Sequence, residues 1–90
     1  MAEVHTSIQL VFLARLRERF GVARETLSLD SSEISVASLL AKLRSRDSVF
    51  ADELAEGRAY RVAVNHTVVG GEHSVRAGDE VAIFPPVTGG

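Results

Sequence analysis

The chain has 90 residues, of which 46% are hydrophobic and 24% are charged. These values are typical of one globular domain and exclude a disordered chain. The formal net charge of −2 gives no general attraction to nucleic acid or to an anionic membrane, and the absence of cysteine excludes a disulfide scaffold, a thiolate metal site and a cysteine nucleophile.

The first predicted strand spans Ile8 to Leu13, because its side chains alternate between two faces that both carry apolar groups. One face holds Ile8, Leu10 and Phe12, and the other holds Gln9, Val11 and Leu13. Apolar residues from Ala14 to Phe20 then follow helical spacing, and Gly21 stands where a left-handed residue ends a helix. A strand followed by a short first helix is therefore expected.

The main helix is predicted after a second strand at Glu25 to Leu29. Ser35 is suited to cap its first turn, and Ser31 and Ser32 are interpreted as further caps. A stripe of apolar residues at helical spacing follows, comprising Val36, Leu39, Leu40 and Leu43. Such a stripe is typical of a helix that packs on a core, and the helix lacks the basic opposite face of a membrane-surface helix.

The second half of the chain is predicted to hold short strands separated by turns. A loop with a helical turn, residues 48–57, tucks Val49, Phe50 and Leu54 inward. The predicted strands are residues 61–65, 66–69 and 80–84, with turns at Asn65-His66, Gly70-Gly71 and Ala77-Gly78-Asp79. Along the last strand, Val81 and Ile83 face opposite to Ala82 and Phe84.

This order predicts an α+β domain in which the main helix covers one face of a mixed sheet of about five strands. The other face should then hold Leu13, Phe84 and Val68, apolar side chains that are partly in water. An exposed apolar patch of this kind usually marks a protein interface.

The remaining candidate sites have simpler interpretations. The histidines, His5, His66 and His73, fit no standard metal-ligand spacing, so no metal site is expected. No serine lies in a nucleophile motif, and Gly70-Gly71 lacks the Lys-Ser/Thr of a phosphate loop. The alternating arginines at 15, 17 and 19 are assigned to a solvated face, although one of them could pair with an acidic partner.

The location of the protein is expected to be cytoplasmic. No apolar run approaches the roughly 20 residues of a membrane span. The sequence Met1-Ala2-Glu3 does not begin a charged-then-apolar secretory signal. We therefore expect no membrane partner.

The C-terminal sequence FPPVTGG is the most informative stretch. A frayed terminus is the simplest interpretation of two glycines. However, Pro85 and Pro86 restrict the backbone and direct it away from the sheet in an extended form. Glycines at the tip are useful only where side chains cannot fit, which indicates that the carboxylate of Gly90 reaches a deep and narrow reaction centre. The terminus itself then becomes the functional group.

The C-terminal third of the chain closely resembles the family of molybdopterin synthase small subunits (MoaD), whose members are ubiquitin-like β-grasp sulfur carriers. The resemblance lies in the sequence AVNHTVVGGEHSVRAGDEVAIFPPVTGG. Its most specific parts are the GDEVA turn and strand, residues 78–82, and the terminal FPPVTGG. The segment VFLARLRE, residues 11–18, matches the family's first strand and helix more loosely. The resemblance implies a β-grasp domain at residues 8–84, a flexible N-terminus at 1–7 and an extended tail at 85–90.

The resemblance also implies a function. In the family, an E1-like adenylyltransferase (MoeB-like) uses ATP to adenylate the terminal glycine, and sulfur then replaces AMP to leave a thiocarboxylate. The charged carrier docks on the large (MoaE-like) subunit, in a heterotetramer, and donates sulfur to precursor Z in molybdopterin synthesis. Catalysis lies on the large subunit, so the small subunit has no catalytic residues of its own and no permanently bound cofactor.

Residue by residue, Gly90 matches the acceptor of AMP and sulfur, and Gly89 matches the slim penultimate position. The inserted tail would comprise Pro85, Pro86, Val87, Thr88, Gly89 and Gly90. Phe84, Val68 and Leu13 fall where the family has an apolar docking surface, although a phenylalanine is more usual at Leu13.

Three other functions stay open. A sulfur carrier for thiamine, cysteine or tRNA thiolation would share the fold and the Gly-Gly end. A ubiquitin-like protein modifier would join its activated Gly90 to a lysine of a target. A plain interaction domain with an idle tail is the third alternative.

Overall fold

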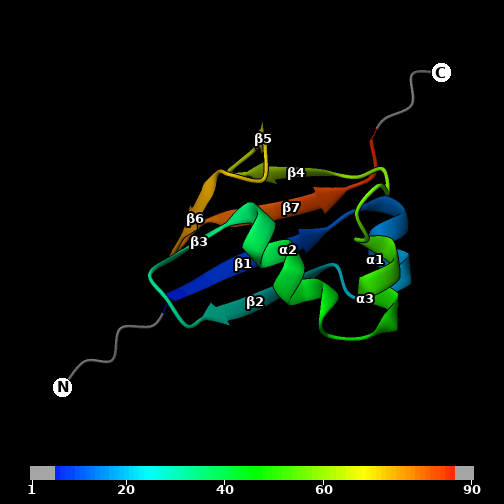
Figure 1. Ribbon diagram of the computed structural model, residues 1–90, viewed down its shortest axis with the longest axis horizontal. Coiled ribbons are helices and arrows are strands. Elements are labelled where there is room, and N and C mark those ends of the chain that lie inside the picture. Colours follow the sequence, from blue (N-terminus) through cyan, green and yellow to red (C-terminus); the bar gives the residue numbers. More distant parts are fainter. Residues whose placement is uncertain (1–5, 87–90) are drawn as a thin grey trace.

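The structure is a computed structural model that describes residues 6–86. Its helices and strands follow one another along the chain as shown in Figure 1. They are β1 (Thr6–Phe12), α1 (Ala14–Phe20), β2 (Arg24–Leu29), β3 (Glu33–Ser35), α2 (Val36–Arg44), α3 (Ser48–Glu53), β4 (Arg61–Val64), β5 (Thr67–Val69), β6 (Ser74–Arg76) and β7 (Glu80–Phe84). The N-terminus expected to be flexible comprises residues 1–7, but Thr6 and Ser7 belong to β1 and pair with β2. Residues 1–5 and the tail residues 87–90 lie outside the described part of the chain.

The large sheet has five strands in the order β2-β1-β7-β4-β5. At its centre, β1 and β7 are parallel, with Gln9 opposite Glu80 and Phe12 opposite Ile83. The other neighbours in this sheet are antiparallel. The expected mixed five-stranded sheet of an α+β domain is therefore confirmed, and the first and last strands of the chain lie side by side.

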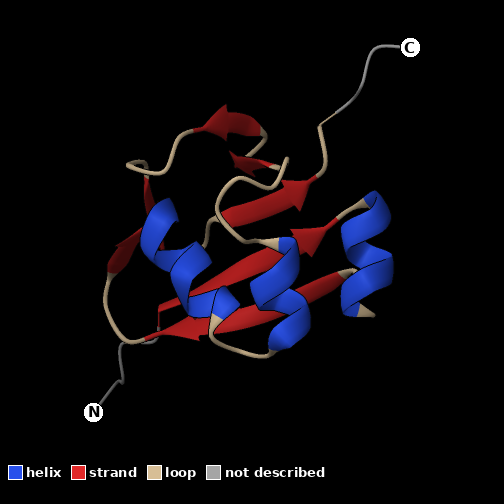
Figure 2. Ribbon diagram, turned by 45° about the vertical axis from the view of Figure 1, so that its right-hand side comes forward, coloured by secondary structure: helices blue, strands red, loops and turns tan. Residues whose placement is uncertain are grey.

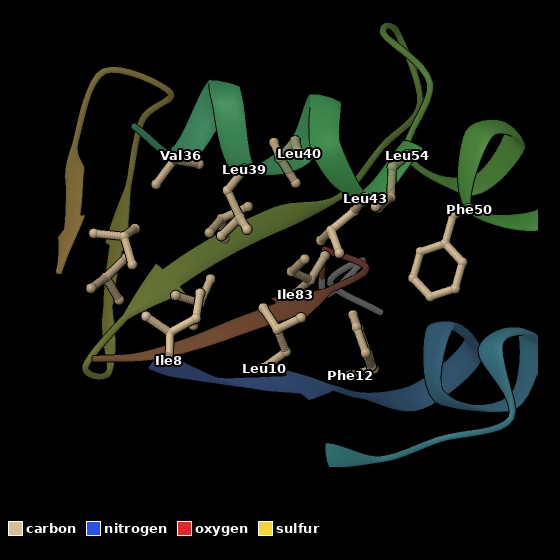
Figure 3. Packing of buried hydrophobic residues seen from close by; sticks show 14 of the residues in the cluster. Ile8, Leu10, Phe12, Val36, Leu39, Leu40, Leu43, Phe50, Leu54 and Ile83 are labelled. Carbon is tan, nitrogen blue, oxygen red and sulfur yellow. The ribbon is translucent and has the colours of Figure 1, made fainter. Parts of the chain in front are cut away.

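Helix α2 packs on one face of this sheet, as the apolar stripe predicts. The Ser35 Oγ accepts a hydrogen bond from the backbone N–H of Ser38 at 3.0 Å, which caps the first turn. Figure 2 shows α2 and α3 in front of the strands and α1 at the end of the sheet. In Figure 3 the stripe of α2 points toward the inward side chains of β1 and β7. The buried core includes Ile8, Leu10, Phe12, Val36, Leu39, Leu40, Leu43, Val81 and Ile83.

Two turns depend on left-handed backbone at positions without glycine. Asn65 and His66 have φ of 49° and 73°, so β4 and β5 are joined by a two-residue hairpin of the type that requires positive φ at both positions. Ala14 has φ of 53°, where the chain turns from β1 directly into α1. This sharp turn buries Leu16 while leaving Leu13 41% exposed.

The expected loop with a helical turn at 48–57 contains the six-residue helix α3. The carboxylate of Asp47 accepts a hydrogen bond from the N–H of Phe50 at 3.0 Å and caps this helix. Asp47 is a usual N-cap residue, so this signal was present in the sequence. Phe50 and Leu54 point into the core as expected, with 7% and 0% of their surfaces exposed.

Strands β3 and β6, each of three residues, form a second sheet that was not predicted from the sequence. Strands of three residues are too short to show a periodicity. Because β3 separates Ser31 and Ser32 from α2, the interpretation of these two serines as caps of that helix is wrong. The Ser31 hydroxyl instead donates to the backbone carbonyl of Glu33 at 2.8 Å.

Two of the three arginines of α1 pair with a buried carboxylate, although all three are exposed, as expected from the sequence. Glu53 on α3 is 3% exposed and accepts hydrogen bonds from Arg15 Nη1 at 2.6 Å and from Arg19 Nε at 2.8 Å. Arg58 Nη2, from the segment before β4, donates to the same carboxylate at 3.4 Å. This cluster ties α1, α3 and the chain before β4 together.

Aromatic packing reinforces the same corner of the fold. The Phe20 and Phe50 rings are stacked with centroids 4.0 Å apart, and Phe12 meets Phe20 edge to face at 4.9 Å. The guanidinium of Arg46 lies 5.1 Å from the centroid of Phe50 and also donates hydrogen bonds to both carboxylate oxygens of Glu25 on β2.

Every helix within residues 6–86 is too short to cross a lipid bilayer.

The Glu53 cluster makes stability depend on pH. The hydrogen bond from Arg19 lowers the pKa of Glu53, burial opposes this change, and the charges of Arg15 and Arg58 lower the pKa further. The carboxylate therefore stabilises the fold above its ordinary pKa of about 4.3, and this contribution is lost as the pH falls through the lower pKa of the folded state.

We predict that Glu53→Gln lowers the free energy of unfolding at pH 7 by about 2 to 4 kcal/mol, because the guanidinium groups then face an uncharged amide. The loss should shrink as the pH falls, since the wild-type carboxylate is then protonated as well. Urea unfolding at pH 7 and at acidic pH measures both effects.

The control is Asp52→Asn, which removes a neighbouring carboxylate that is 64% exposed and 4.0 Å from Arg58. Exposed pairs of this kind contribute little, so the change should stay below about 0.5 kcal/mol. Equal losses for the two variants, or a Glu53→Gln loss that does not depend on pH, would contradict the role assigned to Glu53.

Candidate docking face and tail

The face of the large sheet that points away from α2 carries rows of apolar side chains. The register of β1, β7, β4 and β5 aligns Val11, Ala82, Ala63 and Val68 in one row, because residues opposite each other in neighbouring strands share a face. The next row contains Leu13 and Phe84. We call this surface the outer patch, and it comprises Val11, Leu13, Ala63, Val68, Ala82 and Phe84.

Leu13 belongs to the outer patch although β1 ends at Phe12. Its backbone is still extended, with φ −118° and ψ 155°, so the alternation of β1 continues by one residue. The N–H of Leu13 donates to the carbonyl of Ile83 at 3.2 Å, which holds it beside β7. Leu13 is thereby aligned with Phe84.

The structure brings the three expected docking residues to one face. Leu13 is 41% exposed and Val68 is 59% exposed, and no other large hydrophobic side chain among residues 6–86 is as open to solvent. Phe84 is half-buried. Their role in binding a partner stays a prediction, as does the role of the tail.

Polar residues border the outer patch on the edge strand β2 and on the side away from Leu13 and Phe84. Arg24 Nη2 and Glu80 Oε2 are 3.0 Å apart, and His66 Nε2 lies 3.5 Å from Glu80 Oε1. The Gln9 side-chain amide donates to the Thr26 hydroxyl at 2.9 Å. The polar groups on this border therefore satisfy one another.

The tail leaves the sheet directly beside the outer patch. Strand β7 runs parallel to β1, so its last residue, Phe84, reaches the end of the sheet at which α1 begins (Figure 1). Pro85 and Pro86 follow and are half-buried. The other predicted tail residues, Val87, Thr88, Gly89 and Gly90, lie outside the described residues.

A network that the sequence did not suggest fixes the start of β7. The Asp79 carboxylate accepts hydrogen bonds from the Arg76 N–H at 2.8 Å and the Asn65 side-chain amide at 3.0 Å. These bonds hold the pKa of Asp79 below its ordinary value, and the bond from the Arg76 N–H has the largest effect. The Asn65 side chain also accepts from the N–H of Glu80 at 3.0 Å. The turns before β5 and β7 are thus joined, which sets the register that places Phe84.

The histidines are dispersed over the chain. His66 lies in the β4–β5 turn beside Glu80, His73 lies in the turn before β6, and His5 lies outside the described residues. Within residues 6–86 no group of three or more His, Cys, Asp or Glu side chains could hold a metal ion. The same part of the chain contains no pocket.

A comparison with protein families decides the relationship. The model of the ThiS family matches residues 10–90. The chain belongs to the ThiS family. Two curated relatives from Escherichia coli and Haemophilus influenzae are each named molybdopterin synthase sulfur carrier subunit. They are 36% and 34% identical to the chain, and each match covers 92% of the chain and 99% of the relative.

Solved structures share the fold. A candidate molybdopterin converting factor subunit 1 from Pyrococcus furiosus has a TM-score of 0.77 at 28% identity, over 91% of this chain and 99% of that chain. The small archaeal modifier protein SAMP1 from Haloferax volcanii has a TM-score of 0.75 at 26% identity, over 93% and 99%. A Helicobacter pylori complex of subunits 1 and 2 of molybdopterin-converting factor matches at 0.61 and 19% identity, over 94% and 100%, which shows the fold alone.

The family match and the solved structures agree with the α+β, β-grasp architecture expected from the sequence. The family match extends from β1 to residue 90, so it includes the FPPVTGG sequence as well as the folded domain.

Proposed function

We propose that this chain is the sulfur carrier subunit of a molybdopterin synthase. The observation that carries this proposal is the position of Phe84, which ends β7 on the outer patch and is followed at once by Pro85 and the rest of the PPVTGG sequence. A partner that covers the outer patch therefore lies next to the point where the tail begins. The names of the curated relatives support the same function.

The reactive group in this proposal is the carboxylate of Gly90. It attacks the α-phosphate of ATP on an E1-like activating enzyme, forms an acyl adenylate and releases pyrophosphate. A sulfur nucleophile then displaces AMP and leaves a thiocarboxylate on Gly90. ATP is a substrate of the activating enzyme, so the carrier itself needs no permanently bound cofactor.

Sulfur transfer then takes place on the large synthase subunit. The carrier docks through Leu13, Val68 and Phe84, and the segment from Pro85 to Gly90 enters the active site of the large subunit. There the thiocarboxylate gives its sulfur to precursor Z, and residues of the large subunit carry out the catalysis. Because the activating enzyme would use the same outer patch, binding of the two partners is mutually exclusive.

The tail sequence suits insertion into a narrow channel. Ordering a backbone costs about 1 to 2 kcal/mol per residue, and the fixed φ of Pro85 and Pro86 reduces the cost for the first steps. Glycine adds to the cost but leaves room where side chains would clash. Docking of the outer patch supplies the binding energy for this ordering. The cytoplasmic location and the heterotetramer expected from the sequence remain predictions.

A second candidate function is protein modification, which is favoured by the similarity to a small archaeal modifier protein at 26% identity. In that case a lysine amine of a target attacks the adenylated Gly90 in place of sulfur and forms an isopeptide bond. The outer patch and the tail would serve activation in both functions. Sulfur carriers of the thiamine, cysteine or tRNA pathways differ only in the acceptor.

Incubation with the E1-like enzyme, ATP and a sulfur donor is predicted to raise the intact mass by the difference between a sulfur and an oxygen atom. A chain that lacks Gly90 should fold normally, keep its mass and support no molybdopterin synthesis. Covalent adducts on immunoblots without this mass change would favour the modifier. Normal synthesis with the shortened chain, or with a chain amidated at Gly90, would refute the proposal.

Replacing Phe84 by Ala is predicted to weaken binding to the large subunit by about 1 to 3 kcal/mol, because an aromatic anchor of the interface is lost. Titration calorimetry measures this change. Ile34→Ala is the matched control, since Ile34 is also a half-buried apolar residue but lies on β3, in the smaller sheet. Unchanged affinity of the Phe84 variant would show that the outer patch is not the docking surface.

A further inference from the structure

Arg61 lies beside Phe84, a residue of the outer patch. It is the residue of β4 directly opposite Phe84 in the antiparallel pair, so both side chains are on the outer face of the sheet. Side chains at such positions have Cβ atoms about 4.5 to 5.5 Å apart. Arg61 is exposed, and its row of the sheet also contains Leu13. An arginine therefore stands next to Phe84, and Leu13 lies on the other side of Phe84 in the same row.

Within residues 6–86, the charge of Arg61 has no counterpart on this face. The strand register places three charged residues there, and two of them, Arg24 and Glu80, form an ion pair with each other at 3.0 Å. Among residues 6–86 no carboxylate lies within ion-pairing distance of Arg61. As far as the described residues go, the outer face thus has a neutral border at one end and a single positive charge at the end where the tail leaves.

Two of the described acidic residues pair with other arginines. Glu53 holds Arg15, Arg19 and Arg58 on the helical side of the molecule, and Glu25 holds Arg46. These two carboxylates are therefore not available to neutralise Arg61.

Docking would change the surroundings of Arg61. A partner that covers Phe84 and Leu13 removes water from the neighbouring guanidinium, and a charge that loses its water without gaining a partner is strongly unfavourable. Arginine is well suited to such a position because its planar group can make two parallel hydrogen bonds to a carboxylate. Arginine is also enriched among the residues that dominate binding energy at interfaces.

We propose that Arg61 is a specificity-determining residue, which pairs with a carboxylate of the large subunit at the tail end of the outer patch. This inference rests on the proposed function. The surface that complements this chain is then an apolar strip with one acidic side chain, placed where the strip meets the channel for the tail. A surface without that acidic group, or with a basic group there, binds poorly.

The test measures the affinity of the full chain for the large subunit by titration calorimetry at low and high salt. Arg61→Ala should weaken binding by about tenfold or more, and Arg61→Glu by about a hundredfold or more, since a carboxylate would then face a carboxylate. Arg61→Lys should fall between the wild type and Arg61→Ala, because it keeps the charge but loses the paired hydrogen bonds. The salt dependence should be weaker for Arg61→Ala than for the wild type.

The matched control is Lys42→Glu, which makes the same charge change at an exposed residue of α2, the helix on the opposite face of the sheet. It should change the affinity by less than about twofold, because exposed charges farther apart than a Debye length are screened. Thermal unfolding of each variant verifies that the fold is retained. A large-subunit variant in which one acidic residue becomes lysine should restore binding of Arg61→Glu and identify the paired carboxylate.

The outcomes separate this inference from the proposed function. If Phe84→Ala weakens binding while Arg61→Ala binds like the wild type, the outer patch docks the large subunit and the pairing of Arg61 is wrong. If Arg61→Glu weakens binding but Arg61→Ala does not, the wild-type arginine only avoids repulsion between like charges, and the proposed pair is also wrong. If the wild-type chain does not bind the large subunit, the proposed function itself fails.

Discussion

The parallel pairing of β1 with β7 is the constraint on which the rest of the molecule depends. It joins the first and last strands of the fold at the centre of the sheet, with Leu10, Val81 and Ile83 fully buried beneath α2. The same pairing aligns Leu13 with Phe84 on the opposite face and directs the end of β7 toward α1. The core, the outer patch and the starting point of the tail are therefore fixed by one set of backbone hydrogen bonds.

Strand alternation separates stability from recognition. Along β7, Val81 and Ile83 belong to the core, whereas Ala82 and Phe84 belong to the outer patch. A partner can cover the second set without disturbing the first, because a β-strand presents successive side chains to opposite faces. Five residues of one strand thus contribute to folding and, in the function we propose, to docking and to the placement of the reactive end.

The distribution of charge follows the same division. On the helical side, the buried Glu53 engages three arginines and holds α1, α3 and the segment before β4 together. On the outer face, Arg24 and Glu80 neutralise each other and Arg61 stands alone within the described residues. The first cluster stabilises the fold, and the second arrangement leaves one positive charge for a partner. In the function we propose, the folded domain selects the partner and directs the tail, and Gly90 carries the reactive group.

The sequence by itself determined the features that depend on neighbouring residues: the alternation of the long strands, the apolar stripe and Ser35 cap of α2, the turn at Asn65-His66 and the terminal FPPVTGG motif. Only the tertiary structure decided which strands are neighbours, that Arg15 and Arg19 pair with Glu53, and that Arg61 stands beside Phe84. The physical reason is separation along the chain. Periodicity and capping are local, whereas these pairs join residues that are distant in sequence and meet only after the core has formed.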